Sequence, residues 1–370
     1  MTAPKAEQHS RLVTRSRAAV RFALDELRTW SLVRKAKQRT ADVIEQLKGI
    51  RAANPGRPLC GILLIEHIGD IIACEPVIAQ VRASHPNALL LWGVKPAYAS
   101  LVRSHPGLDA VVCVDSLLGV ERIVQSHVFD IIVDLHVNSK ATEVAGRFYR
   151  KRAGDRTVDV ANYVGVGSLL QSFSKAAGIE PRSEQPAMYL PKDVVAAVDR
   201  HSLPEHFVVV HAHSNYSPKD WPPEKWRDLV RFILEHYETS VIEIGLESKI
   251  ELDHARFIRL CGKLSITETA ELIRRADFFI GIDSGPAHMA NASRRPALLL
   301  FGRYAGSDTF NPFEGHFRDA EATVIFRYAG PLREQRVRTV IQALEASPMW
   351  NEALGKHRRS GASTIPPISQ

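Results

Sequence analysis

Polar side chains gather at one predicted turn between a strand and a helix. Residues 281–292 read Gly-Ile-Asp-Ser-Gly-Pro-Ala-His-Met-Ala-Asn-Ala and follow the apolar run 277–280. The first N–H groups of a helix have no intrahelical partner and lie at the positive end of its dipole, so they bind phosphate well. Asp283, Ser284 and His288 lie beside these groups. The segment therefore predicts a phosphate-binding site, in which Asp283 could bind sugar hydroxyls or cap the helix.

A second group of polar residues follows the first long apolar run of the chain. Residues 65–70 read Ile-Glu-His-Ile-Gly-Asp. Gly69 permits unusual backbone angles at the turn, and Asp70 falls at the start of a helix predicted over residues 71–81. A carboxylate in this place acts as a general base or caps the helix, and spacing alone leaves both roles open.

A third group of polar residues occupies residues 213–226, His-Ser-Asn-Tyr-Ser-Pro-Lys-Asp-Trp-Pro-Pro-Glu-Lys-Trp. The two prolines and the glutamate suit the first turn of a helix. Ser214, Asn215 and Lys219 offer a hydroxyl, an amide and an ammonium group, all of which can bind phosphate. The alternative is a polar loop with a solvated lysine.

The apolar runs recur at a spacing that predicts alternating strands and helices. Continuous apolar runs are typical of strands buried on both faces of a parallel sheet. In the first half of the chain the predicted strands are residues 59–66, 88–93, 110–115 and 129–135. In the second half they are residues 207–211, 241–245, 277–282, 297–301 and 322–326. The predicted helices between and after them include residues 155–179 and 331–346.

Two such blocks predict an α/β fold with two Rossmann-like domains facing across a cleft. The prolines at 181 and 186 mark the link between them. We expect a basic helical extension over residues 1–58, domains over residues 59–185 and 186–346, and a disordered tail over residues 347–370. Ligands bind at the carboxyl ends of the strands in such sheets, so all three polar groups would line the cleft.

The positive charge of the chain is concentrated near its N-terminus. The sequence has 48 Lys and Arg against 41 Asp and Glu, and residues 1–58 have 13 against 5. The remainder is close to neutral and lacks a nucleic-acid recognition motif, so no nucleic-acid partner is expected. No apolar run approaches the roughly 18 residues of a membrane span, and we expect no secretory signal. The four cysteines lie beside apolar runs, which predicts buried thiols in a reducing compartment.

The N-terminal extension has the pattern of an amphipathic basic helix. Its apolar residues recur at helical spacing between arginines: Val20, Ala23, Leu24, Leu27 and Trp30. Such a helix suits an anionic membrane surface, which residues 1–50 would contact. The alternatives are a helix that packs on the body of the protein and a partly disordered arm.

Taken together, the three polar groups resemble the pattern of glycosyltransferase family 9, the heptosyltransferase-like enzymes. The matching strings are Gly69-Asp70, then Lys219-Asp220-Trp221-Pro222 with Trp226, then Asp283-Ser284-Gly285-Pro286-Ala287-His288. The resemblance covers about residues 59–346. It implies a GT-B fold, with the acceptor on the first domain and the nucleotide-sugar on the second.

The resemblance also implies roles for individual residues. Asp70 would be the general base, and Asp283 would hold the sugar. The other donor-binding residues would be Ser214, Asn215, Lys219, Glu247, Lys263, Leu264, Ser284, Gly285 and His288. Of these, Glu247 would bind the ribose, and Lys263 and Leu264 would line the adenine pocket. The donor would be ADP-heptose, and the acceptor a lipopolysaccharide-core or related glycan.

The chemistry implied is a single displacement that inverts the sugar. Asp70 takes the proton of the attacking hydroxyl, while Lys219 and the helix start stabilise the departing nucleoside diphosphate. The chain contains no Asp-x-Asp pair, so we predict that no metal and no other cofactor takes part. Two departures from the family pattern are notable: Ser284 replaces the commoner threonine, and Glu75 places a charge where it could reshape the acceptor side. Arg303 and Tyr304 lie where the sugar-end contacts vary.

Two other classes of function remain open. A Rossmann oxidoreductase would need a Gly-x-Gly-x-x-Gly turn after residues 59–66, and none is present. A non-catalytic nucleotide-sugar-binding protein would not need Asp70, Lys219, Asp283 and His288 together. The expected location is the cytoplasm, with the extension on the cytoplasmic face of the inner membrane.

Overall fold

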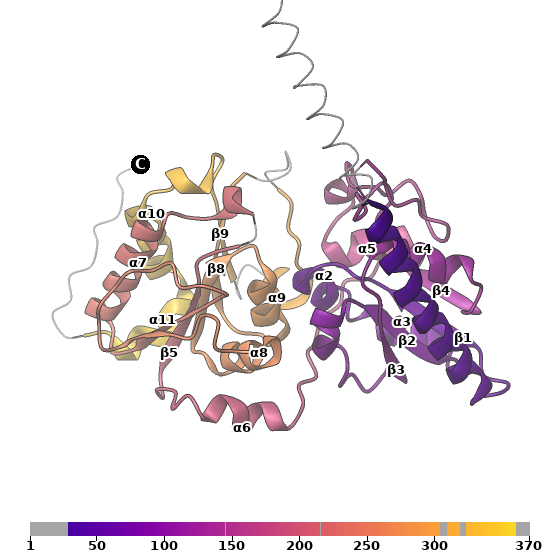
Figure 1. The fold of residues 1–370 in the computed structure, drawn as a ribbon. Coiled ribbons are helices and arrows are strands. Elements are labelled where there is room, and N and C mark those ends of the chain that lie inside the picture. The colour runs from indigo at the N-terminus through magenta and orange to yellow at the C-terminus, as the bar shows by residue number, and fades with distance from the viewer. Residues whose placement is uncertain (1–28, 145, 215, 304–308, 319–322, 360–370) are drawn as a thin grey trace, which may run out of the picture.

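The computed structural model describes residues 29–144, 146–214, 216–303, 309–318 and 323–359, which form two parallel sheets (Figure 1). The first sheet has the order β3-β2-β1-β4, with β1 Leu59–Leu63, β2 Leu89–Val94, β3 Ala110–Cys113 and β4 Ile131–Asp134. The second has the order β10-β9-β8-β5-β6-β7, with β5 Phe207–His211, β6 Ser240–Ile244, β7 Phe257–Arg259, β8 Phe278–Ile282, β9 Ala297–Phe301 and β10 Thr323–Arg327. All nine predicted strands are present. Only the three-residue β7 lacks a clear apolar signal.

Helices cover both faces of each sheet. An unlabelled helix spans residues 29–52. The labelled helices are α2 Ile68–Ala73, α3 Val77–Ser84, α4 Leu117–Gln125, α5 Leu169–Ala177, α6 Asp193–Asp199, α7 Pro223–His236, α8 Ile266–Arg275, α9 Gly285–Ala292, α10 Val337–Ala346 and α11 Pro348–Leu354. In Figure 1, α7, α10 and α11 lie on one side of the second sheet, and α8 and α9 lie on the side toward the first sheet.

Several predicted helices differ from those observed. The helix predicted over residues 71–81 is two helices, because Pro76 begins α3 as its N-cap. Of residues 155–179, only α5 is an α-helix; Ser168 and Gln171 form its capping box, and Gly178 ends it at a φ of 73°. The helix predicted over residues 331–346 begins only at Val337.

The prediction of a disordered tail is wrong for residues 348–357. The side chain of Trp350 is fully buried, and its ring lies 5.1 Å from those of both Tyr237 and Phe278. Residues 348–354 therefore complete the outer face of the second sheet. The rest of the predicted tail, residues 360–370, lies outside the described residues.

The described part of the basic extension is a helix that packs on the first sheet. Leu47 is fully buried, and Val43, Ile44 and Ile50 pack around the same cluster. Ion pairs from Arg39 to Asp115 and from Arg51 to Asp130 tie the helix to the loops at the two ends of the sheet. The alternative of packing on the body therefore holds for this half of the extension. Residues 20–28 lie outside the described residues.

Each sheet contains one point where the strand order reverses. In the first sheet β1 lies between β2 and β4, so the reversal falls between β1 and β4. In the second sheet it falls between β5 and β8. The crossovers leave in opposite directions at such a point, so the carboxyl ends of the two strands border a crevice that can hold a ligand.

Among the described residues, no helix combines the length and the apolar character that a membrane span needs.

Candidate active site

The reversal point of the second sheet brings together two of the predicted polar groups. Lys219 lies in the turn after β5, and Asp283 follows β8. The ammonium of Lys219 is 2.5 Å from Oδ2 of Asp283, and both side chains are largely buried. Two segments 64 residues apart in the chain thus meet through one ion pair at the predicted phosphate site.

Ser284 is the N-cap residue of α9, yet its hydroxyl does not cap the helix. The Oγ donates to the carbonyl oxygen of Ile282 at 3.1 Å, and it lies 3.0 Å from Nδ1 of His211. The carbonyl oxygen of Ser284 accepts the N–H of Ala287 at 3.1 Å. Because Pro286 has no N–H, Gly285 supplies the first N–H donor of the helix for a ligand.

His288 is buried and uncharged at neutral pH. Burial lowers its pKa to about 4 and outweighs the carboxylates of Asp283 and Asp70, which act in the opposite direction. Its ring centre is 4.5 Å from that of Phe313, and its Nδ1 has no hydrogen-bond partner among the described residues. His288 is therefore a neutral imidazole and supplies no positive charge to the site.

Asp70 caps a helix, which is one of the two roles that the sequence left open, and its role as general base stays a prediction. It lies in the first turn of α2, and its Oδ2 accepts the backbone N–H of His67 at 3.0 Å in a capping box. Burial alone would raise its pKa, but the hydrogen bond from His67 and the positive charge of Lys140 hold the pKa of this carboxyl below its usual range. The helix cap is therefore also an ionised carboxylate with a second oxygen available to take a proton.

The ends of α2 and α9 place these groups next to one another. A Cβ built on Gly69 would lie 2.7 Å from Cδ2 of His288, and one built on Gly285 would lie 2.9 Å from Cβ of Ile68. The two helix starts therefore touch through their glycines, at the centre of Figure 1. Helix α2, which carries Asp70, is thereby brought against the start of α9, which follows Asp283.

The loop after β5 is held in shape by its own polar groups. The N–H and the Oγ of Ser214 both donate to Oδ1 of Asp220 at 2.8 Å, and Nδ1 of His213 is 2.6 Å from Oδ2 of Asp220. The Ser214 hydroxyl is thus engaged within the loop. The motif tryptophan Trp221 is buried and donates its Nε1–H to the carbonyl oxygen of Gln335 at 2.9 Å. Asn215 lies outside the described residues.

The residues assigned to the nucleoside end follow β6 and β7. The N–H of Gly262 donates to the carbonyl oxygen of Gly245 at 2.8 Å, which joins the two loops. Glu247 is 75% exposed and pairs with Lys249 at 2.8 Å, which lowers the pKa of its carboxyl. Lys263 donates to the carbonyl oxygen of Arg259 at 3.0 Å, and Leu264 packs against the core. Of the three residues assigned to the nucleoside end, Glu247 and Lys263 are exposed and Leu264 is half-buried.

Glu75 is engaged in contacts that hold the fold together. Its Oε1 is 2.7 Å from Nε2 of His105, and its Oε2 accepts the N–H of Ala187 at 2.8 Å. The carboxylate therefore ties the segment between the sheets to the first sheet. The suggestion that Glu75 could reshape the acceptor side stays a prediction.

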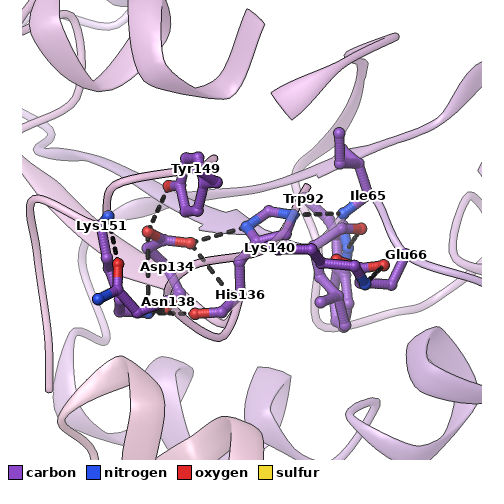
Figure 2. A network of polar contacts seen from close by, with 10 residues as sticks. Ile65, Glu66, Trp92, Asp134, His136, Asn138, Lys140, Tyr149 and Lys151 are labelled. Atoms are coloured by element: carbon purple, nitrogen blue, oxygen red, sulfur yellow. Dashed lines mark hydrogen bonds and ion pairs between the residues drawn. The ribbon is translucent and has the colours of Figure 1, made fainter. Parts of the chain in front are cut away.

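Sequence reasoning missed a polar network at the reversal point of the first sheet (Figure 2). Asp134, at the end of β4, is followed by His136, Asn138 and Lys140, and Lys140 forms an ion pair with Glu66. The signal was present as polar residues directly after a predicted strand. Because the network contains no motif string, it did not stand out.

Glu66, His67 and Asp70 form the single group among the described residues whose side chains could hold a metal ion. Their ligand atoms lie within 4.8 Å of one another. Glu66 is paired with the ammonium of Lys140, however, and Asp70 is engaged by His67. The cation that faces this group is therefore a lysine side chain, and the expectation of a metal-free reaction stays a prediction.

Comparisons with known proteins relate the chain to one enzyme family. Residues 140–310 match the sequence model of glycosyltransferase family 9 (heptosyltransferase). Lipopolysaccharide heptosyltransferase 1 of Campylobacter coli is 22% identical over 295 residues, which cover 65% of this chain and 83% of the relative. The protein of the same name from Salmonella typhimurium is 20% identical over 286 residues, which cover 65% and 87%.

Solved structures with the same fold cover most of the chain. A glycosyl transferase of family 9 from Veillonella parvula has a TM-score of 0.60 and 16% identity, over 80% of this chain and 97% of its own. The ADP-heptose lipopolysaccharide heptosyltransferase II of E. coli has a TM-score of 0.59 and 16% identity, over 80% and 99%. The α/β GT-B fold predicted from the sequence is confirmed.

Proposed function

Starting from a chain that is a heptosyltransferase-like protein of the glycosyltransferase family 9 type, we propose that it moves heptose from ADP-heptose to a hydroxyl group of a lipopolysaccharide-core or related glycan. The observation that carries this proposal is the contact between α2, which carries Asp70, and the start of α9, which directly follows Asp283 of the Lys219–Asp283 ion pair. A sugar transfer needs a base for the acceptor and a group that binds the donor phosphates. The carboxylate follows a strand of the first sheet, and the phosphate-binding group follows a strand of the second.

The donor binds at the carboxyl end of the second sheet. Its diphosphate binds the ammonium of Lys219 and the first N–H of α9, and Ser214 and Asn215 are proposed as further contacts of the diphosphate. Its sugar hydroxyls take the place of Lys219 on Asp283. Glu247 binds the ribose, and Lys263 and Leu264 flank the base. The joined loops after β6 and β7 support this assignment, since they put Glu247 and Lys263 at the same edge.

The reaction is one displacement. The acceptor oxygen attacks the anomeric carbon as the bond from that carbon to the diphosphate oxygen breaks, and the hydroxyl proton passes to Asp70. The configuration at the anomeric carbon therefore inverts. Asp70 can take this proton because its carboxylate is ionised at neutral pH. Lys219 and the N–H of Gly285 stabilise the charge that develops on the departing ADP, and no metal is required.

Each of the two proposed domains contains one of the two sheets. We propose that residues 59–185 form the acceptor domain and residues 186–346 the nucleotide-sugar domain. We also propose a cytoplasmic location, and a lipopolysaccharide acceptor because the relatives are named lipopolysaccharide heptosyltransferases.

The exposed end of the helix over residues 29–52 is proposed to contact an anionic membrane. Trp30 is 61% exposed, Leu32 is 46% exposed, and the guanidinium of Arg34 lies 5.3 Å from the Trp30 ring. An aromatic ring beside basic groups suits the headgroup region. Trp30→Ser with Leu32→Ser should weaken sedimentation with anionic liposomes. Binding equal to that of the wild type contradicts this contact, and neutral liposomes provide the control.

The transfer proposal is tested with the wild type and Asp70→Asn. ADP and ADP-heptose should raise the melting temperature of both proteins, because a ligand at 100 times its Kd adds about 2.7 kcal/mol of stability. ADP release in the presence of acceptor should fall by about 10² to 10⁴-fold in Asp70→Asn, the usual worth of a general base. Equal activity of the two proteins contradicts the role of Asp70. Donor binding without transfer by the wild type favours a non-catalytic binding protein.

A further inference from the structure

His136 is fully buried between the ends of two strands, and both of its ring nitrogens are engaged (Figure 2). Its Nδ1 is 2.8 Å from Oδ1 of Asp134, and its Nε2 accepts the backbone N–H of Ile65 at 3.1 Å. A nitrogen that accepts an N–H carries no proton, so the ring proton is on Nδ1 and points to the carboxylate. The two bonds fix the ring orientation.

The bond to Ile65 continues the sheet beyond the last backbone pair. The ladder between β1 and β4 ends at Leu63 and Asp134, and the N–H of Leu135 then donates to the carbonyl oxygen of Leu63 at 3.1 Å. Beyond this point the segments that follow β1 and β4 continue into separate loops. The imidazole therefore replaces a backbone carbonyl as the acceptor for the N–H of Ile65, which would otherwise be buried without a partner.

Asp134 is itself held from several sides. Its Oδ2 accepts the hydroxyl of Tyr149 at 2.7 Å, and the ammonium of Lys151 is 3.7 Å away. That ammonium is buried and donates to the carbonyl oxygens of Asp134 and His136. Buried polar networks in which every member is satisfied are rigid. The acceptor presented to Ile65 therefore has a fixed position.

We infer that Asp134 and His136 are positioning residues that set the place of Asp70 through the loop between β1 and α2. Ile65 is anchored by His136, and His67 is anchored by the Asp70 carboxylate at 3.0 Å. Glu66, between them, is paired with Lys140, which belongs to the same loop as His136. Ile65, Glu66 and His67, which lead into α2, are thus each held by a hydrogen bond or an ion pair. This inference rests on the proposed role of Asp70 as the base.

The decisive comparison uses three substitutions. His136→Leu removes the acceptor for Ile65 and the donor to Asp134. His136→Gln keeps an amide oxygen that reaches toward the same N–H. Tyr149→Phe is the matched control, because it removes one hydrogen bond from the same network and leaves the bond between His136 and Ile65 in place.

Two measurements are made on each protein: hydrogen exchange of the peptide covering residues 64–70, and the steady-state constants of sugar transfer. We expect His136→Leu to exchange faster in this peptide and to lose about tenfold or more in kcat, since about 1 Å of misplacement can cost 10²-fold. The KM for the donor should be unchanged, because the donor lies on the other sheet. His136→Gln should recover most of both properties.

The alternatives give different results. Faster exchange with an unchanged kcat overturns the inference, and so does an equal loss of kcat in Tyr149→Phe, which would point to general weakening of the network. If the wild type transfers no sugar, the proposed function fails. Positioning of the loop is then judged on the exchange data alone, and exchange in His136→Leu equal to that of the wild type overturns it.

Discussion

Gly69 of α2 lies directly against the imidazole of His288 in α9. A Cβ at residue 69 would be 2.7 Å from Cδ2 and 3.1 Å from Nε2 of that ring. The ring cannot move away easily, because it is buried beside Phe313. The approach of the two sheets at the candidate site therefore depends on a residue without a side chain.

Gly69→Ala should separate the two helix starts. Overpacking of this kind typically costs about 1–3 kcal/mol, and the widened gap should lower kcat by about tenfold or more. Steady-state transfer and urea unfolding measure the two effects. Gly49→Ala is the control, because a Cβ there meets nothing within 4 Å and the residue lies inside a helix. Wild-type kcat in Gly69→Ala would show that this contact does not limit the reaction.

Lys219→Ala should weaken donor binding more than it weakens the fold. Hydrogen bonds to charged groups are worth about 1.5–3 kcal/mol, so the donor Kd should rise by about 10 to 100-fold. Isothermal titration with ADP and ADP-heptose measures the change. Lys48→Ala removes a lysine that is 59% exposed on the helix over residues 29–52 and should bind the donor normally. Wild-type affinity in Lys219→Ala would remove this lysine from the donor site.

Stability should fall as the pH is lowered from 7 to 5. Burial lowers the pKa of His211 and of His288 from 6.5 to about 4. Below pH 6.5 the unfolded chain binds protons that the folded protein does not, so stability is lost as pH falls toward 4. At pH 5 the loss is about 2 kcal/mol for each histidine. Urea unfolding at pH 7 and pH 5 measures it.

The matched comparison for this pH effect is His288→Gln, which has one titrating group fewer. The difference in unfolding free energy between pH 7 and pH 5 should shrink by about 2 kcal/mol. His127→Asn, at an exposed position with a φ of 53°, should leave the difference unchanged. An equal difference in all three proteins would mean that His288 does not contribute to the loss of stability in acid.

Glu75→Ala should loosen the segment that connects the two sheets. It leaves the N–H of Ala187 and the ring of His105 without their acceptor, which typically costs about 1–3 kcal/mol. We expect faster proteolysis within residues 180–191 and a lower midpoint of urea unfolding. Glu75→Gln retains a carbonyl oxygen for Ala187 and should resemble the wild type. Unchanged proteolysis in Glu75→Ala would show that the segment is held by other contacts.

Much of the fold could be predicted because the strands are buried on both faces and read as continuous apolar runs. The short β7 has one buried residue, Phe257, and so gives no such run. The tail around Trp350 has a polar composition, and its packing depends on aromatic partners distant in the sequence. Composition alone therefore assigned it to disorder.

Some residues of the candidate site could be predicted from the sequence, and others could not. The motif strings located Asp70, Lys219 and Asp283 because each follows an apolar run. The roles of Glu75 and His136 could not be predicted, since each depends on a partner that only the fold brings near: Ala187 for Glu75 and Ile65 for His136. Sequence spacing carries no information about such pairs when they lie on different elements.

The ion pair between Lys219 and Asp283 has a consequence for ligand selectivity. Before the donor arrives, each charge neutralises the other at 2.5 Å. A free phosphate or nucleotide that captures Lys219 draws the ammonium away from the Asp283 carboxylate, and a free sugar that binds Asp283 breaks the same ion pair. Only a molecule that presents an anion and hydroxyl groups together replaces both lost contacts. On the proposed function, the pair is a filter that admits the intact nucleotide-sugar and disfavours each of its fragments.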